Sequence, residues 1–236
     1  MKKTIFTVVM AVFMAIGAYA QFSISTDVVS RYVWRGTQFS ASAIQPGIGY
    51  STGGFSAGAW GSYDLVDGMG TELDLYAGYD FDFGLGLIVT DYFFPMDPFD
   101  QMAIYEESGS ITTTAGYFAK ANHTLEIGAT YSIGGLSLGV YKMLSKEWSG
   151  AEDMYVEASY AFNDNLSLTV GAGDNAYSTE YGQDLMEDKD NFEVCNIGLS
   201  YGKEVALTET WSVSPFISFI LNPNAEQTFL VVGVSF

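Results

Sequence analysis

Residues 71–83 alternate apolar and polar side chains without a break. Leucine, alanine, tyrosine and phenylalanine hold the odd positions from Leu73 to Phe83, and four carboxylates fall on even positions. Because successive side chains of a strand point to opposite faces, one face is apolar and the other acidic. The run is long enough for a tilted transmembrane strand, which needs about 9–11 residues. A solvated sheet shows the same alternation, so recurrence of the pattern decides between the two.

The pattern recurs between short turns rich in glycine and asparagine. It predicts twelve strands, at residues 22–36, 43–51, 55–65, 71–83, 87–94, 123–133, 136–144, 154–162, 166–173, 192–202, 211–221 and 228–236. Short connections follow the second, fourth, sixth, eighth and tenth strands, and longer ones follow the third, fifth, seventh and ninth; the longest spans 95–122. An even strand number with this asymmetry is typical of outer-membrane barrels and places both termini in the periplasm. The predicted fold is therefore all-β: a closed antiparallel up-and-down transmembrane β-barrel of about 12 strands.

Residues 1–20 have the pattern of a cleaved secretory signal peptide. Lys2 and Lys3 precede an apolar run, and Ala18-Tyr19-Ala20 matches an A-x-A cleavage site. A membrane anchor is the alternative, but the run is too short for one. The predicted organisation is a signal peptide over 1–20 and an outer-membrane barrel over 21–236.

Composition narrows the classes of partner. Without Lys2 and Lys3, 7 basic residues face 28 acidic ones, a net charge of −21. Nucleic acid is excluded as a partner, because binding phosphates needs a basic surface. The single cysteine, Cys195, leaves no internal disulfide. Its position predicts an apolar side chain on the outward face of strand 192–202.

Strand number predicts which face meets lipid. Eight strands leave an interior that side chains can fill, and twelve leave more. An inward apolar face would line a wide wet cavity, whereas an outward one meets lipid. Aromatic residues near the strand ends would then form interfacial girdles. These are Tyr32, Trp34, Tyr50, Tyr63, Phe83, Tyr131, Tyr160, Phe162, Tyr201 and Trp211.

The polar face then lines the lumen. Its predicted members are Asp27, Arg31, Arg35, Gln45, Ser62, Asp64, Glu72, Asp74, Asp80, Asp82, Glu126, Thr130, Glu157 and Asn196. Arg31 and Arg35 fall four residues apart on one predicted strand and form a basic patch in an acidic lining. Such a lining favours cations and orients dipolar solutes. Alternatively, these charges pair with one another and fill the barrel, and the sequence leaves both possibilities open.

The C-terminal strand carries an assembly pattern. Leu230, Val232, Val234 and the terminal Phe236 share one face. This arrangement resembles the assembly signal of bacterial outer-membrane barrels. The predicted partners are the barrel-assembly machinery, outer-membrane lipid and small solutes.

One segment is similar to a known family. The residues Asp27-Val28-Val29-Ser30-Arg31-Tyr32-Val33-Trp34-Arg35-Gly36, followed by Gln45-Pro46-Gly47 and Tyr50, resemble the start of the TorF-family porins of Gram-negative bacteria. The likeness is specific over about residues 24–65 and diffuse afterwards. It implies a small outer-membrane barrel acting as a pore, and no catalytic residues. The long connection 95–122 departs from the family pattern.

Three other functions are weighed. An outer-membrane lipid hydrolase needs a Ser-His pair at the outer rim, and His123 is the only histidine. The acidic segment with Asp184, Glu187, Asp188 and Asp190 offers oxygen ligands for a divalent cation, but it lacks calcium-loop spacing. A closed structural or adhesive barrel is the third. We favour a porin-like channel for small polar or cationic solutes, neither an enzyme nor a holder of a metal or cofactor.

Overall fold

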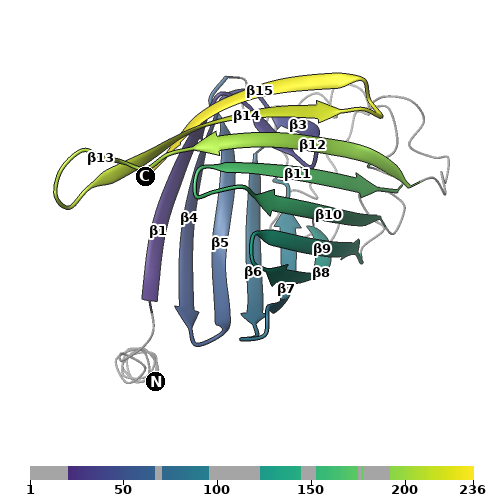
Figure 1. Ribbon diagram of the computed structural model, residues 1–236, viewed down its shortest axis with the longest axis horizontal. Helices are drawn as coiled ribbons and strands as arrows, with labels where there is room; N and C mark the ends of the chain where they lie inside the picture. The colour runs from purple at the N-terminus through teal and green to yellow at the C-terminus, as the bar shows by residue number, and fades with distance from the viewer. Residues whose placement is uncertain (1–20, 67–70, 96–122, 145–152, 175–176, 178–191) are drawn as a thin grey trace, which may run out of the picture.

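The computed structural model describes residues 21–66, 71–95, 123–144, 153–174, 177 and 192–236. Twelve antiparallel strands form a closed wall (Figure 1). They are β1 (Gln21–Val29), β4 (Ala43–Thr52), β5 (Phe55–Asp64), β6 (Glu72–Asp80), β7 (Leu85–Phe93), β8 (His123–Ile133), β9 (Leu136–Met143), β10 (Met154–Ala161), β11 (Leu166–Gly173), β12 (Glu193–Gly202), β14 (Ser212–Asn222) and β15 (Gln227–Ser235). The predicted signal peptide, nearly all of connection 95–122 and the acidic segment 184–190 lie outside the described residues.

Two pairings close the ring. Strand β12 pairs with β14 from Ile197↔Leu221 to Gly202↔Phe216. The first strand, β1, pairs with the last, β15, only over Asp27–Val29 and Gly233–Ser235. No strand edge is therefore left open around the whole wall, as a barrel requires. The predicted closed antiparallel barrel is confirmed.

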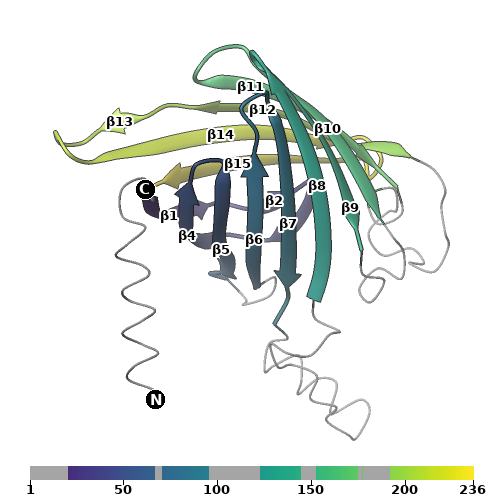
Figure 2. The same ribbon diagram turned by 90° about the horizontal axis from the view of Figure 1, so that it is seen from below.

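The two rims of the barrel differ in their connections. Tight turns at 53–54, 81–84, 134–135 and 162–165 lie on one rim, together with the segment 203–211 that carries β13 (Val205–Ala206). Gln21 pairs with Ser51, which places the start of the wall on this rim as well. The opposite rim is formed by the ends of β5, β7, β9 and β11, and Figure 2 shows the end of β7 beside the start of β8 there. Strand 71–83 was predicted too long, because β6 ends at Asp80 and Asp82 lies in the following turn.

The predicted strand 22–36 is the main difference. Strand β1 ends at Val29, and the chain then leaves the wall. Residues 30–42 form a separate two-stranded sheet of β2 (Tyr32–Trp34) and β3 (Thr37–Ser40), which we call the inner hairpin. Its tip is a tight turn in which Arg35 and Gly36 both have positive φ, 49° and 81°. A two-residue turn with positive φ at both positions matches the right-handed twist of the two strands that it joins.

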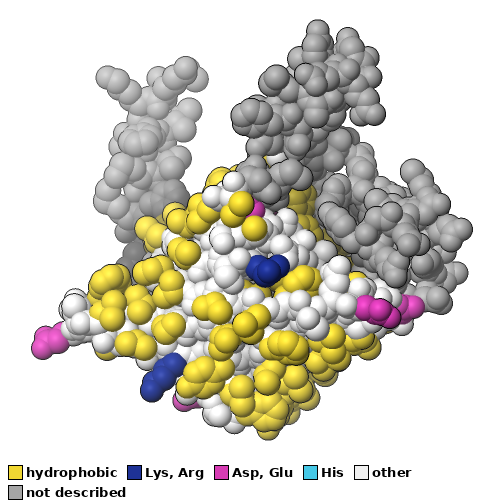
Figure 3. Space-filling view, turned by 90° about the horizontal axis from the view of Figure 1, so that it is seen from above, with side chains coloured by type: hydrophobic (Ala, Val, Ile, Leu, Met, Phe, Trp, Pro, Cys, Tyr) yellow, Lys and Arg dark blue, Asp and Glu magenta, His cyan; other side chains and the backbone are white. Residues whose placement is uncertain are grey.

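The outward face of the wall is apolar. Large exposed side chains recur at every second position, such as Ile24 at 83% exposure, Leu230 and Phe219. Figure 3 shows hydrophobic side chains spread over one face of the barrel, with few charged groups among them. Monomeric soluble proteins rarely expose contiguous apolar patches larger than a few hundred Å². Within the described residues, the chain has no helix with the length and hydropathy of a membrane span.

Aromatic pairs gather near the rim of tight turns. Phe22 packs against Tyr50 with tilted rings whose centroids are 5.1 Å apart, and edge-to-face pairs form between Tyr79 and Phe81 at 4.8 Å and between Tyr160 and Phe162 at 5.2 Å. Of the aromatic residues expected in the girdles, Tyr50, Tyr63, Phe83, Tyr131, Tyr160, Phe162, Tyr201 and Trp211 lie on the wall or in its connections. Tyr32 and Trp34 do not, because they belong to the inner hairpin.

Cys195 also differs from its predicted placement. The register between β11 and β12 shifts at Gly171/Ala172, so β12 carries an extra residue there. A bulge of this kind re-aims the side chains that follow it. Cys195 is therefore buried inside the barrel, whereas Val194 and Leu199 face outward. Cys195 packs with Tyr155 and Tyr177 in one buried cluster. A second cluster lies where the inner hairpin meets β1, β4 and β15, and it consists of Val29, Tyr32, Ala43 and Val231.

Candidate functional site in the barrel lumen

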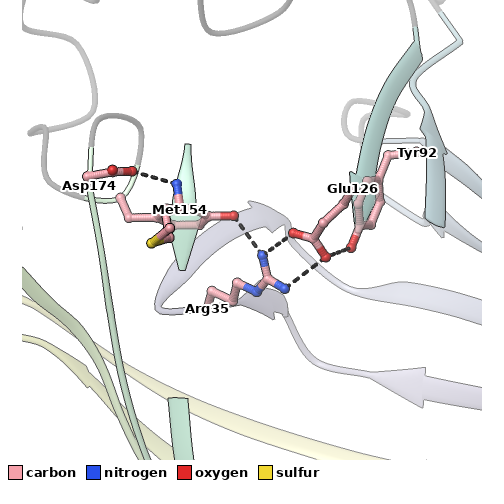
Figure 4. A network of polar contacts seen from close by, with 6 residues as sticks. Arg35, Tyr92, Glu126, Met154 and Asp174 are labelled. Carbon is pink, nitrogen blue, oxygen red and sulfur yellow. Dashed lines mark hydrogen bonds and ion pairs between the residues drawn. The ribbon is translucent and has the colours of Figure 1, made fainter. Parts of the chain in front are cut away.

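Arg35, at the tip of the inner hairpin, crosses the lumen to Glu126 on β8 (Figure 4). Arg35 Nη1 donates to Glu126 Oε2 at 2.6 Å, and Nη2 donates to Oε1 at 3.0 Å. The side chains are only 8% and 4% exposed. A guanidinium and a carboxylate joined by two parallel hydrogen bonds form one of the strongest charge pairs in proteins. The pair therefore fixes the hairpin tip against the far wall.

Aromatic rings surround the same guanidinium. The Arg35 Cζ atom lies 4.4 Å from the ring centroids of both Tyr141 on β9 and Tyr155 on β10, and 4.3 Å from that of Trp34. A fourth ring, Tyr177, is 5.7 Å away, and its hydroxyl accepts a hydrogen bond from Arg35 Nη1 at 2.7 Å. Cations over aromatic faces within about 6 Å are stabilised by the ring quadrupole. We call Glu126, Tyr141, Tyr155 and Tyr177 together the cage.

Glycines on neighbouring strands leave room for the cage. A Cβ added at Gly171 would stand 1.8 Å from the Tyr155 hydroxyl, and one at Gly173 would stand 2.5 Å from the Tyr177 ring. Both contacts are too short for any side chain larger than hydrogen. The two tyrosines therefore lie against bare backbone of β11.

Further hydrogen bonds hold the cage and the tip. Tyr92 on β7 donates from its hydroxyl to Glu126 Oε1 at 3.0 Å. Asn196 Nδ2 donates to the Tyr155 hydroxyl at 3.2 Å. Asn222, at the end of β14, donates from Nδ2 to the Gly36 carbonyl at 3.1 Å. Close to the cage, the Asp174 carboxylate accepts a hydrogen bond from the Met154 amide at 2.6 Å and so fixes the start of β10 (Figure 4).

The base of the inner hairpin meets a second acidic group. Tyr32 is hydrogen-bonded to Glu72 on β6, and its ring lies 5.5 Å from that of Trp60. Burial, reinforced by the Glu72 carboxylate, raises the pKa of Tyr32 above its ordinary value, so its hydroxyl keeps its proton. Glu72 Oε2 and Asp74 Oδ1 are buried, and neither has a hydrogen-bond partner among the described residues. The lumen thus carries acidic groups beyond the one that Arg35 neutralises.

The structure places most of the predicted lumen residues on the inward face of the wall. These are Asp27, Gln45, Ser62, Asp64, Glu72, Asp74, Asp80, Glu126, Thr130, Glu157 and Asn196. Asp64 accepts hydrogen bonds from the amides of Ala41 and Val66, so it supports the return of the inner hairpin to the wall. Gln45 Nε2 donates to Ser62 Oγ at 3.3 Å.

Three predicted lumen residues lie off the wall. Arg35 is in the turn at the tip of the inner hairpin rather than on a wall strand, and Asp82 is in the turn after β6. Arg31 is exposed at the base of the inner hairpin, where its Nη1 donates to Gln38 Oε1 at 2.8 Å. The two arginines therefore make separate contacts instead of one basic patch.

Sequence reasoning missed the aromatic half of the site. Tyr92, Tyr141, Tyr155 and Tyr177 were not among the predicted lumen residues. Tyr155 alternates in step with Glu157, and Tyr92 competes with Asp91 for the polar face, so a signal was present. In the structure Tyr92 faces inward, and Asp91 faces outward beside His123.

His123 begins β8 at the rim of long connections. Its Nδ1 lies 2.9 Å from both carboxylate oxygens of Asp91, and its ring packs at a tilt against that of Phe93, with centroids 4.8 Å apart. No group of three or more histidine, cysteine, aspartate or glutamate side chains is arranged to hold a metal ion in the described part of the chain.

The family comparison matches residues 15–212, which include the inner hairpin and the cage. The matching model is described as "Bacterial protein of unknown function (Gcw_chp)". The chain belongs to this family. No curated protein matches the chain in sequence.

Solved structures similar to this Gcw_chp member include several channels. A chain solved for work on the asymmetric conductivity of engineered proteins is 16% identical, with a TM-score of 0.41; the alignment covers 82% of this chain but only 55% of that one. The NanC porin is 9% identical over 91% of this chain and 99% of its own, with a TM-score of 0.43. The CymD monoaromatic hydrocarbon channel is 8% identical, with coverages of 92% and 87% and a TM-score of 0.44. These scores are low, and the barrel is established by its own strand pairing.

Proposed function

We propose that this chain is a channel of the Gram-negative outer membrane for small polar or cationic solutes, and that the inner hairpin closes it in the conformation described. The observation that carries the proposal is the contrast between the two faces of a closed barrel: apolar side chains outside and buried carboxylates inside. In lipid, only closed barrels and helices satisfy all their backbone groups.

The acidic lumen supports selection for cations. Glu72, Asp74, Glu126 and Glu157 come from strands β6, β8 and β10, and among the described residues the one ion pair to this group is that of Arg35 with Glu126. Rings of aspartate and glutamate favour the passage of cations. The proposal assigns no catalytic residue and no cofactor, and it leaves His123 as a partner of Asp91.

The TorF resemblance fits this role. The resembling segment is specific over about residues 24–65, and this range contains the whole inner hairpin together with β4 and β5. The same proposal includes export to the periplasm by the signal peptide and recognition of the C-terminal strand by the barrel-assembly machinery. Leu230, Val232, Val234 and Phe236 share the outward face of β15 and its end.

Planar-bilayer recording tests the proposal with a deletion of residues 32–40. The Tyr32 amide already lies 3.3 Å from the Ala41 carbonyl, so Arg31 can join Ala41 with little change in the wall. We expect rare or no current steps from the wild type and discrete, cation-selective steps from the deletion variant. Heat-modifiable gel mobility confirms that both barrels are folded. A folded deletion variant that never conducts would instead support a closed structural or adhesive barrel.

A further inference from the structure

Three of the four cage residues lie on wall strands and none belongs to the inner hairpin, which supplies the occupant, Arg35, and the Trp34 ring beside it. Glu126, Tyr141 and Tyr155 belong to β8, β9 and β10, and Tyr177 follows β11. In the described part of the chain, β2 and β3 pair only with each other and not with any wall strand. Moving the hairpin would therefore take Arg35 away and leave the cage in place.

An empty cage would be costly. Glu126 is 4% exposed, and Arg35 is the cation that pairs with it. Removing one partner of a buried ion pair leaves an uncompensated charge, which destabilises far more than loss of an exposed pair. The Tyr92 hydroxyl supplies one remaining hydrogen bond, to Glu126 Oε1, and leaves Oε2 without a charged donor. Withdrawal of the hairpin therefore favours any cation that can replace Arg35.

The geometry selects the class of that cation. Glu126 receives two N–H groups from one planar head group, and the rings of Tyr141 and Tyr155 lie at equal distances from its central carbon. A guanidinium fits both features, because it is planar and carries donors in a fixed fork. An ammonium group offers neither a plane nor a fork, and a hydrated metal ion would lose the ring contacts.

We propose that the cage is a binding site for solutes bearing a guanidinium group, and that Arg35 occupies it as a built-in competitor that holds the channel closed. This inference rests on the proposed channel function for its role in transport, whereas the binding site itself does not depend on conductance. An incoming guanidinium displaces Arg35 from Glu126, and the inner hairpin then leaves the lumen.

The test uses methylguanidinium chloride as the probe and the full-length barrel in detergent. We compare wild type, Arg35→Ala and Arg35→Ala/Glu126→Gln by the midpoint temperature of heat-modifiable gel mobility. Sodium chloride and tetramethylammonium chloride at equal concentration serve as salt controls. If Arg35→Ala does not fold, the deletion of residues 32–40 takes its place, because it also leaves the cage residues intact.

We expect methylguanidinium to raise the midpoint of Arg35→Ala by a few degrees above both salt controls, since a ligand that binds only the folded state stabilises it. Wild type, whose cage is occupied, should show no such rise, and neither should the double variant, which lacks the carboxylate. An equal response in all three, or none in Arg35→Ala, overturns the site. If Arg35→Ala conducts but methylguanidinium does not raise its midpoint, the binding site is refuted and the channel function stands. If methylguanidinium raises the midpoint but the protein does not conduct, the binding site stands and the channel function is refuted.

Discussion

Two hairpins of this molecule are built alike but held in different ways. Strands β8 and β9 are joined by Gly134 and Gly135, and β2 and β3 by Arg35 and Gly36; both turns contain positive φ angles. The β8–β9 hairpin has β7 and β10 paired along its two sides. The inner hairpin has no such neighbours in the described structure, and side chains at its tip and base position it.

The difference teaches where each hairpin is vulnerable. A wall hairpin is held by many backbone hydrogen bonds to the strands on both sides, so no single side chain determines its position. The inner hairpin depends on a few buried polar contacts, and a buried polar group that loses its partner is expensive. One substitution should therefore release the inner hairpin and leave the wall intact.

Arg35→Ala should have the largest effect. Breaking a buried ion pair costs about 3–5 kcal/mol, which raises the population of the released hairpin by roughly 150- to 5,000-fold. Limited chymotrypsin digestion, read by mass spectrometry, should find cleavage at Tyr32, Trp34 or Phe39 in the variant and protection in the wild type. Heat-modifiable mobility should show a folded wall in both. Equal protection of the two proteins would mean that Arg35 does not hold the hairpin.

A substitution on the outer wall should come next. Ile127 on β8 is exposed on the apolar face, so Ile127→Arg should lower the free energy of unfolding in lipid vesicles by about 2–4 kcal/mol. Thr130→Arg, on the inward face of the same strand, is the matched control and should change it little. Urea unfolding followed by tryptophan fluorescence measures both. Similar losses for the two variants would contradict the assignment of lipid to the outer face.

Two glycine substitutions give the smallest and most selective contrast. Gly36 and Gly53 both have positive φ, where alanine costs about 1–2 kcal/mol. A Cβ at Gly36 would also lie 1.9 Å from the Cys195 carbonyl oxygen, whereas one at Gly53 would meet nothing within 4 Å. Gly36→Ala should therefore expose the inner hairpin to chymotrypsin, and Gly53→Ala should not. Equal protection of the two variants would show that neither the turn at Gly36 nor its contact with β12 controls the hairpin.

The strands of the wall could be predicted from the sequence because the pattern that marks each strand lies within that strand. Lipid on one side and a polar lumen on the other impose a period of two on each strand, and this period is visible in residues 123–133, where prediction and structure agree. Tight turns such as 134–135 add their own glycine signal. Strand bounds and the outward faces follow from these two patterns.

The inner hairpin and the cage could not be predicted in this way. Alternation continues through Ser30, so residues 22–36 read as one strand although the chain turns inward there. Arg35-Gly36 between short alternating runs is compatible with a hairpin turn, but nothing local says that the hairpin lies inside a barrel. The bulge that turns Cys195 inward depends on the register with β11, which is a property of two strands. The cage joins residues from four parts of the chain, so only the closed barrel brings them together.

Ring closure and interior packing meet at one residue. Ser30 follows the last pair of the short β1–β15 contact, and its amide donates to the Val232 carbonyl at 2.8 Å while its hydroxyl oxygen accepts from the Val232 amide at 2.9 Å. The next residue already belongs to the path into the lumen. The position at which the chain turns inward therefore sets the length of the β1–β15 pairing. We expect closure of the barrel and insertion of the inner hairpin into the lumen to occur as coupled steps of folding.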